Sequence, residues 1–167
     1  MKQLLMATGA FALIAIAGIS DADAGNRAWV QQYGFYNAEA SAQKGKRNEA
    51  VTYQRGRRNE AATVQRGRRN SANTTQHGRF NKALTDQLGR MNVAVTGQSG
   101  KRNEATTIQS GRGNIAGTAQ IGSGLEATTR QTGEDNASGT IQAGHGHTAD
   151  IRQRGTGNVS LTIQSTR

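Results

Sequence analysis

The chain repeats one pattern of small apolar and polar positions every eleven residues. Each unit reads Gln-x-Gly-x-x-Asn-x-Ala-x-Thr-x-Gln, with Ala at the seventh offset in nine of twelve units and Thr at the ninth in ten. From Asn to the next Gln, fixed positions alternate with freely varying ones, which is the side-chain period of a β-strand. The pattern predicts a seven-residue strand in each unit, with the fixed residues inside and Gly-x-x as the turn.

The register of the unit does not break between residues 32 and 164. It is marked by Gln32, Gln43, Gln54, Gln65, Gln76, Gln87, Gln98, Gln109, Gln120, Gln131, Gln142, Gln153 and Gln164. The expected turn glycines are Gly34, Gly45, Gly56, Gly67, Gly78, Gly89, Gly100, Gly111, Gly122, Gly133, Gly144 and Gly155. The asparagines are Asn37, Asn48, Asn59, Asn70, Asn81, Asn92, Asn103, Asn114, Asn136 and Asn158, with Leu125 and His147 in the two remaining units. An unbroken period of this length predicts a stacked repeat protein.

An eleven-residue period also suits a right-handed helical coiled coil. That alternative fails because a glycine in every unit would cost a helix about 1 kcal/mol each, Thr and Asn are poor helix formers, and no apolar seam recurs. Strand and turn together reverse the chain, so two units make one flattened coil of 22 residues. The predicted fold is all-β: a two-sheet parallel β-solenoid of about six coils over residues 32–164, with about 4.8 Å between neighbouring strands.

The interior of this predicted solenoid is polar. Each Asn and Gln lies above its copy in the next coil, and because a carboxamide both donates and accepts, a column of them can form a hydrogen-bonded ladder. Unpaired buried amides would cost a few kcal/mol each. The thirteen glutamines and ten asparagines are therefore the candidate ladder residues.

Composition supports a fold that does not depend on an oil-like core. Hydrophobic residues make up only 34% of the chain, and it contains no Pro and no Cys, so disulfides and thiolate metal sites are excluded. Such a composition is typical of disorder, but a disordered chain has no reason to keep a strict register. The register therefore favours an ordered structure.

The first residues have a different character. Lys2 precedes an apolar run from Leu4 to Ile19, and Ala22-Asp23-Ala24 has the small-x-small pattern of a cleavage site, which predicts a secretory signal peptide over residues 1–24. A mature chain from Gly25 would hold 21 − 1 = 20 basic and 11 − 2 = 9 acidic residues, a net charge of +11. Residues 25–31 would be a short N-terminal segment and residues 165–167 a tail.

With so few residues outside the repeats, we expect a stack without caps. Its two ends would each present a row of unpaired backbone groups, which further molecules can extend. The sequence therefore predicts end-to-end polymerisation into a cross-β fibre.

Positive charge is concentrated in one half of the repeats. Residues 44–112 hold fifteen Lys or Arg against four acidic residues, whereas residues 113–167 hold four of each. Two triplets at the expected turns, on opposite edges of the stack, are the candidate polyanion contacts: Arg55, Arg57 and Arg58, and Arg66, Arg68 and Arg69. These edges either bind a polyanion, such as extracellular DNA or anionic polysaccharide, or only keep the monomer soluble during export.

The sequence contains no arrangement typical of an enzyme. His145 and His147 flank a glycine and are expected to be ordinary exposed histidines, and no catalytic, cofactor-binding or metal-binding residue is predicted. We expect no small-molecule substrate. An ice-binding solenoid is a rival hypothesis because Thr columns can order water, but Thr here shares its strand face with Asn, Ala and Gln and is predicted to lie inside. A soluble polyanion-binding solenoid is a further alternative, which would need end caps.

The tandem unit Gln-x-Gly-x-x-Asn-x-Ala-x-x-x-Gln over residues 32–164, behind a signal peptide, resembles the curlin repeat of the curli fibre subunits of Gram-negative bacteria. The resemblance implies a secreted amyloid subunit that polymerises into a cell-surface fibre for adhesion and biofilm matrix. It also implies other curlin subunits and the curli export machinery as partners, and it leaves open whether the chain is the major subunit or a surface-anchored nucleator. Two features depart from the family: residues 25–31 are short for its export segment, and Thr stands at the ninth offset where larger aliphatic residues are common.

Overall fold

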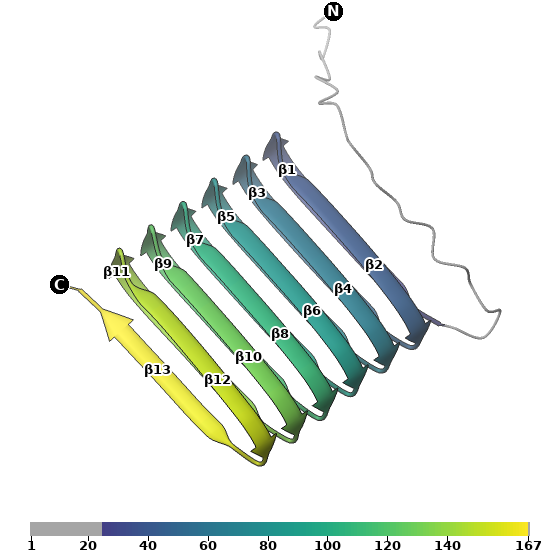
Figure 1. Cartoon of the computed structure of the whole chain (residues 1–167). Coiled ribbons are helices and arrows are strands. Elements are labelled where there is room, and N and C mark those ends of the chain that lie inside the picture. Colours follow the sequence, from purple (N-terminus) through teal and green to yellow (C-terminus); the bar gives the residue numbers. More distant parts are fainter. Residues whose placement is uncertain (1–24, 167) are drawn as a thin grey trace, which may run out of the picture.

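The structure, a computed structural model, describes residues 25–166, which form a flat stack of β-strands (Figure 1). The expected signal peptide, residues 1–24, lies outside the described residues. The described chain contains strands and no helix. The strands are β1 (Arg27–Phe35), β2 (Ala38–Lys46), β3 (Glu49–Arg57), β4 (Glu60–Arg68), β5 (Ser71–Arg79), β6 (Lys82–Arg90), β7 (Val93–Lys101), β8 (Glu104–Arg112), β9 (Ile115–Ser123), β10 (Glu126–Glu134), β11 (Ala137–His145), β12 (Thr148–Thr156) and β13 (Val159–Ser165).

The strands alternate between two parallel sheets that face each other. Odd-numbered strands form a seven-stranded sheet, here called the odd sheet, and even-numbered strands form a six-stranded even sheet. Each strand pairs with the strand two places further along the chain, so that residue i lies beside residue i + 22, as Gln54 does beside Gln76. Two successive strands make one coil. The predicted all-β, two-sheet parallel β-solenoid of about six coils is thus confirmed.

The strands differ from the prediction in their bounds. From β1 to β12, each strand begins one residue after the Asn offset and continues to the third residue after Gln, so β6 includes both Gln87 and Gly89, whereas β13 ends one residue after Gln164. The expectation that the twelve repeat glycines form turns is therefore wrong, because all of them lie within strands. The bend consists of only two residues, such as Met91 and Asn92. Gly89 can remain in the ladder because glycine tolerates its φ of +119°, which a residue with a Cβ rarely adopts.

The stack also begins earlier than the prediction places it. Residues 25–31 are not a separate segment, because β1 starts at Arg27 and pairs in register with β3 from Arg27 beside Glu49. The sequence carries a signal for this additional strand: Asn26 and Ala28 occupy the Asn and Ala offsets of one further unit. Gln32 is therefore the first ladder glutamine but not the first residue of the fold.

The interior lies between the two sheets and is built from narrow columns. Alanines such as Ala94 and threonines such as Thr96 are almost completely buried between the columns of Gln and Asn. The alternate side chains face outward, and Val95 in the same strand is 49% exposed. Small side chains allow the sheets to approach closely, so the polar columns come within hydrogen-bonding reach of the facing sheet.

Candidate functional site

The glutamines form one ladder inside each sheet. From Gln32 to Gln142, each Gln Nε2 donates to the Oε1 of the glutamine 22 residues later, as Gln98 does to Gln120 at 2.8 Å. The same nitrogen donates to a backbone carbonyl of the facing sheet, which for Gln98 is the carbonyl of Lys82 at 2.9 Å. The structure places all thirteen glutamines from Gln32 to Gln164 in these ladders. Each side chain thus links successive coils and also holds the two sheets together.

The glutamine ladders have a direction, because the donor always belongs to the earlier coil and the acceptor to the later one. At the C-terminal end, Gln153 and Gln164 accept from the coil before and have no further glutamine to donate to within the described residues. At the opposite end, Gln32 and Gln43 donate, and among residues 25–166 no earlier glutamine donates to their Oε1 atoms. One end of the stack therefore offers amide donors and the other offers amide acceptors.

The asparagines hold the bends. The backbone N–H and the side-chain amide of Asn92 both donate to Asn70 Oδ1 at 3.2 Å, and Asn92 Nδ2 also lies 3.2 Å from the Gly111 carbonyl oxygen. These asparagines form two columns, one at each edge of the stack. One column runs without interruption and includes a residue that the sequence analysis missed, Asn26, which accepts from Asn48. Its members are Asn26, Asn48, Asn70, Asn92, Asn114, Asn136 and Asn158.

The other asparagine column ends part-way along the stack. It contains Asn37, Asn59, Asn81 and Asn103, and then meets both exceptions to the repeat. Asn103 Oδ1 accepts the backbone N–H of Leu125 at 3.2 Å, but Leu125 has no side-chain amide to continue the column. Leu125 is buried, and the Nε2 atom of His147 is buried without a hydrogen-bond partner. Beyond Asn103, the polar groups at this edge therefore make fewer hydrogen bonds than those at the other edge.

The repeat glycines form two columns of close backbone contacts, one in each sheet. A Cβ built on Gly89 would lie 2.0 Å from the carbonyl oxygen of Gly111 in the next coil, and the same contact recurs from Gly34 to Gly133 at 1.8–2.0 Å. These carbonyls are also the acceptors of the asparagine amides, as Gly111 is for Asn92. Glycine is required here both by its φ and by the space available.

The arginine triplets do not lie on the edges in the way the sequence predicts. Arg57 and Arg68 end strands, and Arg58 and Arg69 lie in the bends. The placement of Arg55 and Arg66 at turns is wrong, because both lie within strands on the outer faces of the sheets. Arg66 also forms an ion pair with Asp86 at 3.5 Å. The reason is that the strands continue past Gln, so the residue directly after Gln, such as Arg55 or Arg66, lies on the outer face of a sheet and not in a bend.

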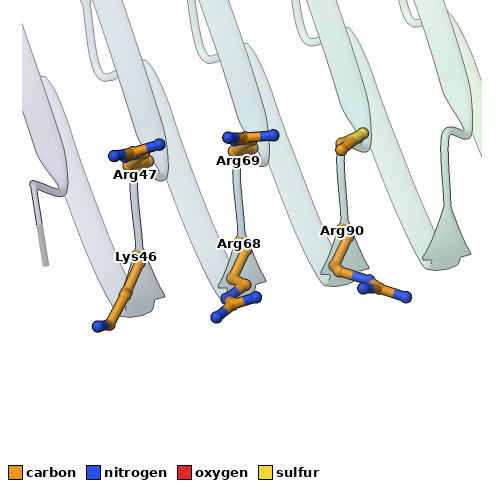
Figure 2. A pocket seen from close by; sticks show the side chains of 6 residues that line it. Lys46, Arg47, Arg68, Arg69 and Arg90 are labelled. Atoms are coloured by element: carbon orange, nitrogen blue, oxygen red, sulfur yellow. The ribbon is translucent and has the colours of Figure 1, made fainter.

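The edge that carries Arg68 and Arg69 is a basic groove. Figure 2 shows its cationic side chains in two rows, Lys46, Arg68 and Arg90 at the strand ends and Arg47 and Arg69 at the bends. Together with Met91 they line a groove of about 340 Å³. We call this surface the basic groove.

The opposite edge alternates arginine with aromatic rings. The Arg58 guanidinium lies 5.6 Å from the ring centre of Tyr36 and 5.5 Å from that of Phe80, and Arg102 lies 6.0 Å from Phe80. These are cation–π distances. The sequence analysis missed this arrangement, although the four residues share one repeat offset and are spaced by 22.

The histidines show no metal-binding arrangement in the described part of the chain. His145 Nδ1 lies 2.7 Å from Ser123 Oγ, and among residues 25–166 no group of three or more His, Asp or Glu side chains could hold a metal ion. A search of the same residues finds no helix that is long and apolar enough to cross a membrane.

Comparison with protein-family models identifies the repeats of this chain. The model of the curlin associated repeat matches two adjacent segments, residues 67–100 and 100–133. Residues 67–133 of the chain are thus similar to curlin associated repeats. The matched segments begin and end at glycines of the close-contact columns, Gly67, Gly100 and Gly133, and the units on either side continue the same ladders. No curated protein matches the chain.

Proposed function

We propose that this curlin-repeat protein is a structural subunit of a curli-type amyloid fibre. In this proposal it is exported, and its stacks join end to end at the cell surface into a fibre for adhesion and biofilm matrix. Its main partner is a second copy of the chain, with other curlin subunits and the curli export machinery as further partners. The proposed role is structural and involves no substrate or cofactor.

The observation that carries this proposal is the direction of the glutamine ladders. The donors of Gln153 and Gln164 at one end match the acceptors of Gln32 and Gln43 at the other, so head-to-tail contact continues both ladders, whereas contact between like ends opposes donor to donor or acceptor to acceptor. The edges of the end strands extend by the same parallel pairing that joins strands inside the stack.

Purified mature protein tests the proposal. We expect thioflavin-positive fibres that diffract near 4.7 Å along the fibre axis and 10 Å across it. Replacing Gln32 and Gln43 with Ala removes the acceptor end and should block addition there, while the donor end still adds wild-type subunits. A chain that stays a soluble monomer at high concentration would contradict the proposal. Acceleration of wild-type assembly by trace amounts of this chain, without its incorporation along the fibre, would identify a nucleator instead.

A second proposed function is the binding of polyanions, such as extracellular DNA or anionic polysaccharide, along the edges. The observation that favours it is backbone strain. Arg47, Arg58, Arg69 and Arg102 adopt φ values of 53–57°, a left-handed conformation that costs a residue with a Cβ about 1 kcal/mol relative to glycine. Later units place Gly113, Gly124, Gly146 and Gly157 at the same offset. Arginine at these bends is therefore unfavourable for the fold, which supports a role outside folding.

The basic groove allows a charge-matched test of polyanion binding. One variant combines Arg47→Gly, Arg68→Gln and Arg69→Gly. The control removes the same charge from the outer face of the even sheet through Arg130→Gln, Arg152→Gln and Arg154→Gln. We expect the groove variant to lose most DNA retention by fibres at low salt and to show a shallower salt dependence, since each lost phosphate contact lowers the slope by about 0.9. Equal losses in the two variants would indicate that net charge, and not the groove, governs retention.

A further inference from the structure

The two sheets of the described stack contain different numbers of strands. The odd sheet has seven and the even sheet six, so β13 ends one sheet and β12 the other (Figure 1). A strand that followed β13 in the same alternating order would pair with β12, in the even sheet. This difference constrains how a second copy can join, given the proposed end-to-end assembly on which the inference rests.

Two ways of joining are possible. If the incoming β1 pairs with β13, the odd sheet continues, but the incoming β2 lies two strand spacings from β12 and leaves a gap about one strand wide, roughly 4.8 Å. If instead the incoming β1 pairs with β12 and its β2 pairs with β13, both sheets continue without a gap. The second arrangement keeps all strands parallel when the incoming copy is rotated by half a turn about the stack axis.

Side chains inside the stack distinguish the two arrangements independently. The seventh offset is Ala in most units, but it is Glu39 in β2, Ser138 in β11 and Ser160 in β13. Ser138 and Ser160 are neighbours in the odd sheet, and Glu39 is the first residue of the corresponding column in the even sheet. The half-turn arrangement sets the Glu39 carboxylate of the incoming copy directly over the Ser160 hydroxyl. The unrotated arrangement leaves Glu39 above Ala149, facing the gap.

The environment of Glu39 shows why it needs such a partner. Its side chain is half-buried and accepts a hydrogen bond from Ser41, and burial raises the pKa of its carboxyl above the ordinary value while Ser41 and Thr52 lower it. A buried carboxylate is stabilised by each added hydroxyl donor. Ser160 is only half-buried and lies at the open end of the stack, where its hydroxyl can donate to an incoming group.

The outer faces agree with the same arrangement. In the half-turn arrangement, exposed Val159, Leu161 and Ile163 continue into Ala38, Ala40 and Ala42 of the incoming β2. In the unrotated arrangement, Arg154 of β12 and Lys44 of the incoming β2 would share a column across the gap, so two like charges would lie two strand spacings apart, roughly 9.6 Å.

We propose that successive subunits of the fibre are related by a half turn about its axis, with β1 on β12 and β2 on β13 of the preceding subunit, and that Ser160 of one subunit binds Glu39 of the next. Opposite sides of the fibre then alternate between odd and even sheets from one subunit to the next. The partner that this surface fits is a second copy of the same chain.

Disulfide cross-linking tests the geometry, because the chain has no cysteine of its own. In the half-turn arrangement, the double variants Ala40→Cys with Leu161→Cys and Trp29→Cys with Asp150→Cys each place two outward Cα atoms about one strand spacing apart, within disulfide range. The double variant Trp29→Cys with Leu161→Cys reports the unrotated arrangement. After oxidation of fibres and dissolution without reductant, we expect covalent multimers from the first two variants only. Cross-linking of the third variant, or of none, would overturn the inference.

A side-chain test uses a matched serine pair. Ser160→Ala should slow elongation on wild-type seeds by about tenfold or more, because a donor to a buried carboxylate is lost. Ser138→Ala is the control: it lies one coil deeper in the same column, and its Oγ is buried without a hydrogen-bond partner, so elongation should stay within about twofold. Equal rates for the two variants would overturn the Glu39–Ser160 contact. Failure of the wild-type chain to form fibres would instead contradict the proposed function.

Discussion

The glycine columns give the sharpest prediction about the fold, through the substitution Gly89→Ala. The new Cβ would lie 2.0 Å from the Gly111 carbonyl oxygen, well inside van der Waals contact, and the φ of +119° belongs to a region almost restricted to glycine. Relieving the contact requires the two coils to separate by about 1 Å, which weakens strand pairing and the bond from Asn92 Nδ2 to the Gly111 carbonyl.

The expected cost is the sum of these effects. The unfavourable φ contributes about 1–3 kcal/mol, and two or three weakened hydrogen bonds contribute about 1 kcal/mol each. A total of about 3–6 kcal/mol corresponds to a loss of roughly a hundred-fold to twenty-thousand-fold in the equilibrium between ordered and unfolded chain. One methyl group should therefore prevent most molecules from adding to a fibre.

Gly97→Ala is the matched control, from the next strand. Gly97 faces outward, and a Cβ there would meet only the Thr118 carbonyl oxygen at 3.9 Å, an ordinary contact. Its φ is not in the left-handed region, so alanine should change stability by less than about 1 kcal/mol and can even stabilise. The assay is elongation on wild-type seeds, with the guanidinium midpoint of fibre dissolution as a second readout. If Gly89→Ala elongates as fast as Gly97→Ala, the close-contact explanation of the glycine columns is wrong.

Three further predictions concern the asparagine column, the bends and the half-buried carboxyl of Glu39. Leu125→Asn should extend the interrupted asparagine column and raise the guanidinium midpoint of fibres; no gain, or a loss, would show that burial of Leu125 matters more than the missing rung. Arg69→Gly should relieve backbone strain and stabilise the chain by up to about 1 kcal/mol while weakening DNA retention, and a destabilised variant would contradict the strain argument. Because the folded-state pKa of Glu39 is raised, its contribution to the stability of the unassembled chain is most favourable below about pH 4.5 and is lost as pH rises through the raised pKa. Glu39→Gln should remove this pH dependence in thermal unfolding of the monomer.

Most of the fold follows from the sequence because the repeat encodes it redundantly. A period of two between Asn and Gln sets which residues face inward, and a period of eleven sets the coil. The strand bounds could not be predicted in the same way. Glycine is usually a turn signal, and only the backbone shows that Gly89 is extended with positive φ and that the bend is shortened to Met91 and Asn92.

The edges were harder to predict than the interior, for a related physical reason. Once strands extend past Gln, the offset of Arg55 and Arg66 changes from bend to sheet face, and Arg66 meets Asp86 from the neighbouring strand. Pairing between residues 20 apart depends on this register. By contrast, Arg58 and Phe80 occupy the same offset of the repeat and are 22 residues apart. Their stacking could therefore be predicted by comparing residues one full coil of 22 apart, and not only within the unit of eleven.

The same reading in columns explains how a chain with so few large apolar residues can hold together and also extend. In a conventional globular protein, the apolar side chains are buried within one molecule, so the core does not favour the addition of further copies. Here each buried glutamine amide is satisfied partly by the facing sheet and partly by its neighbours along the axis, so within residues 25–166 the column at each end remains incomplete: Gln164 lacks an acceptor in the next coil, and Gln32 lacks a donor from the one before. At an open end of the stack the half-buried amides can bind only water in the ladder direction, whereas a further copy of the chain continues the column by direct hydrogen bonds. In the proposed fibre, the interactions that stabilise the fold are therefore also the ones that favour the addition of a further copy.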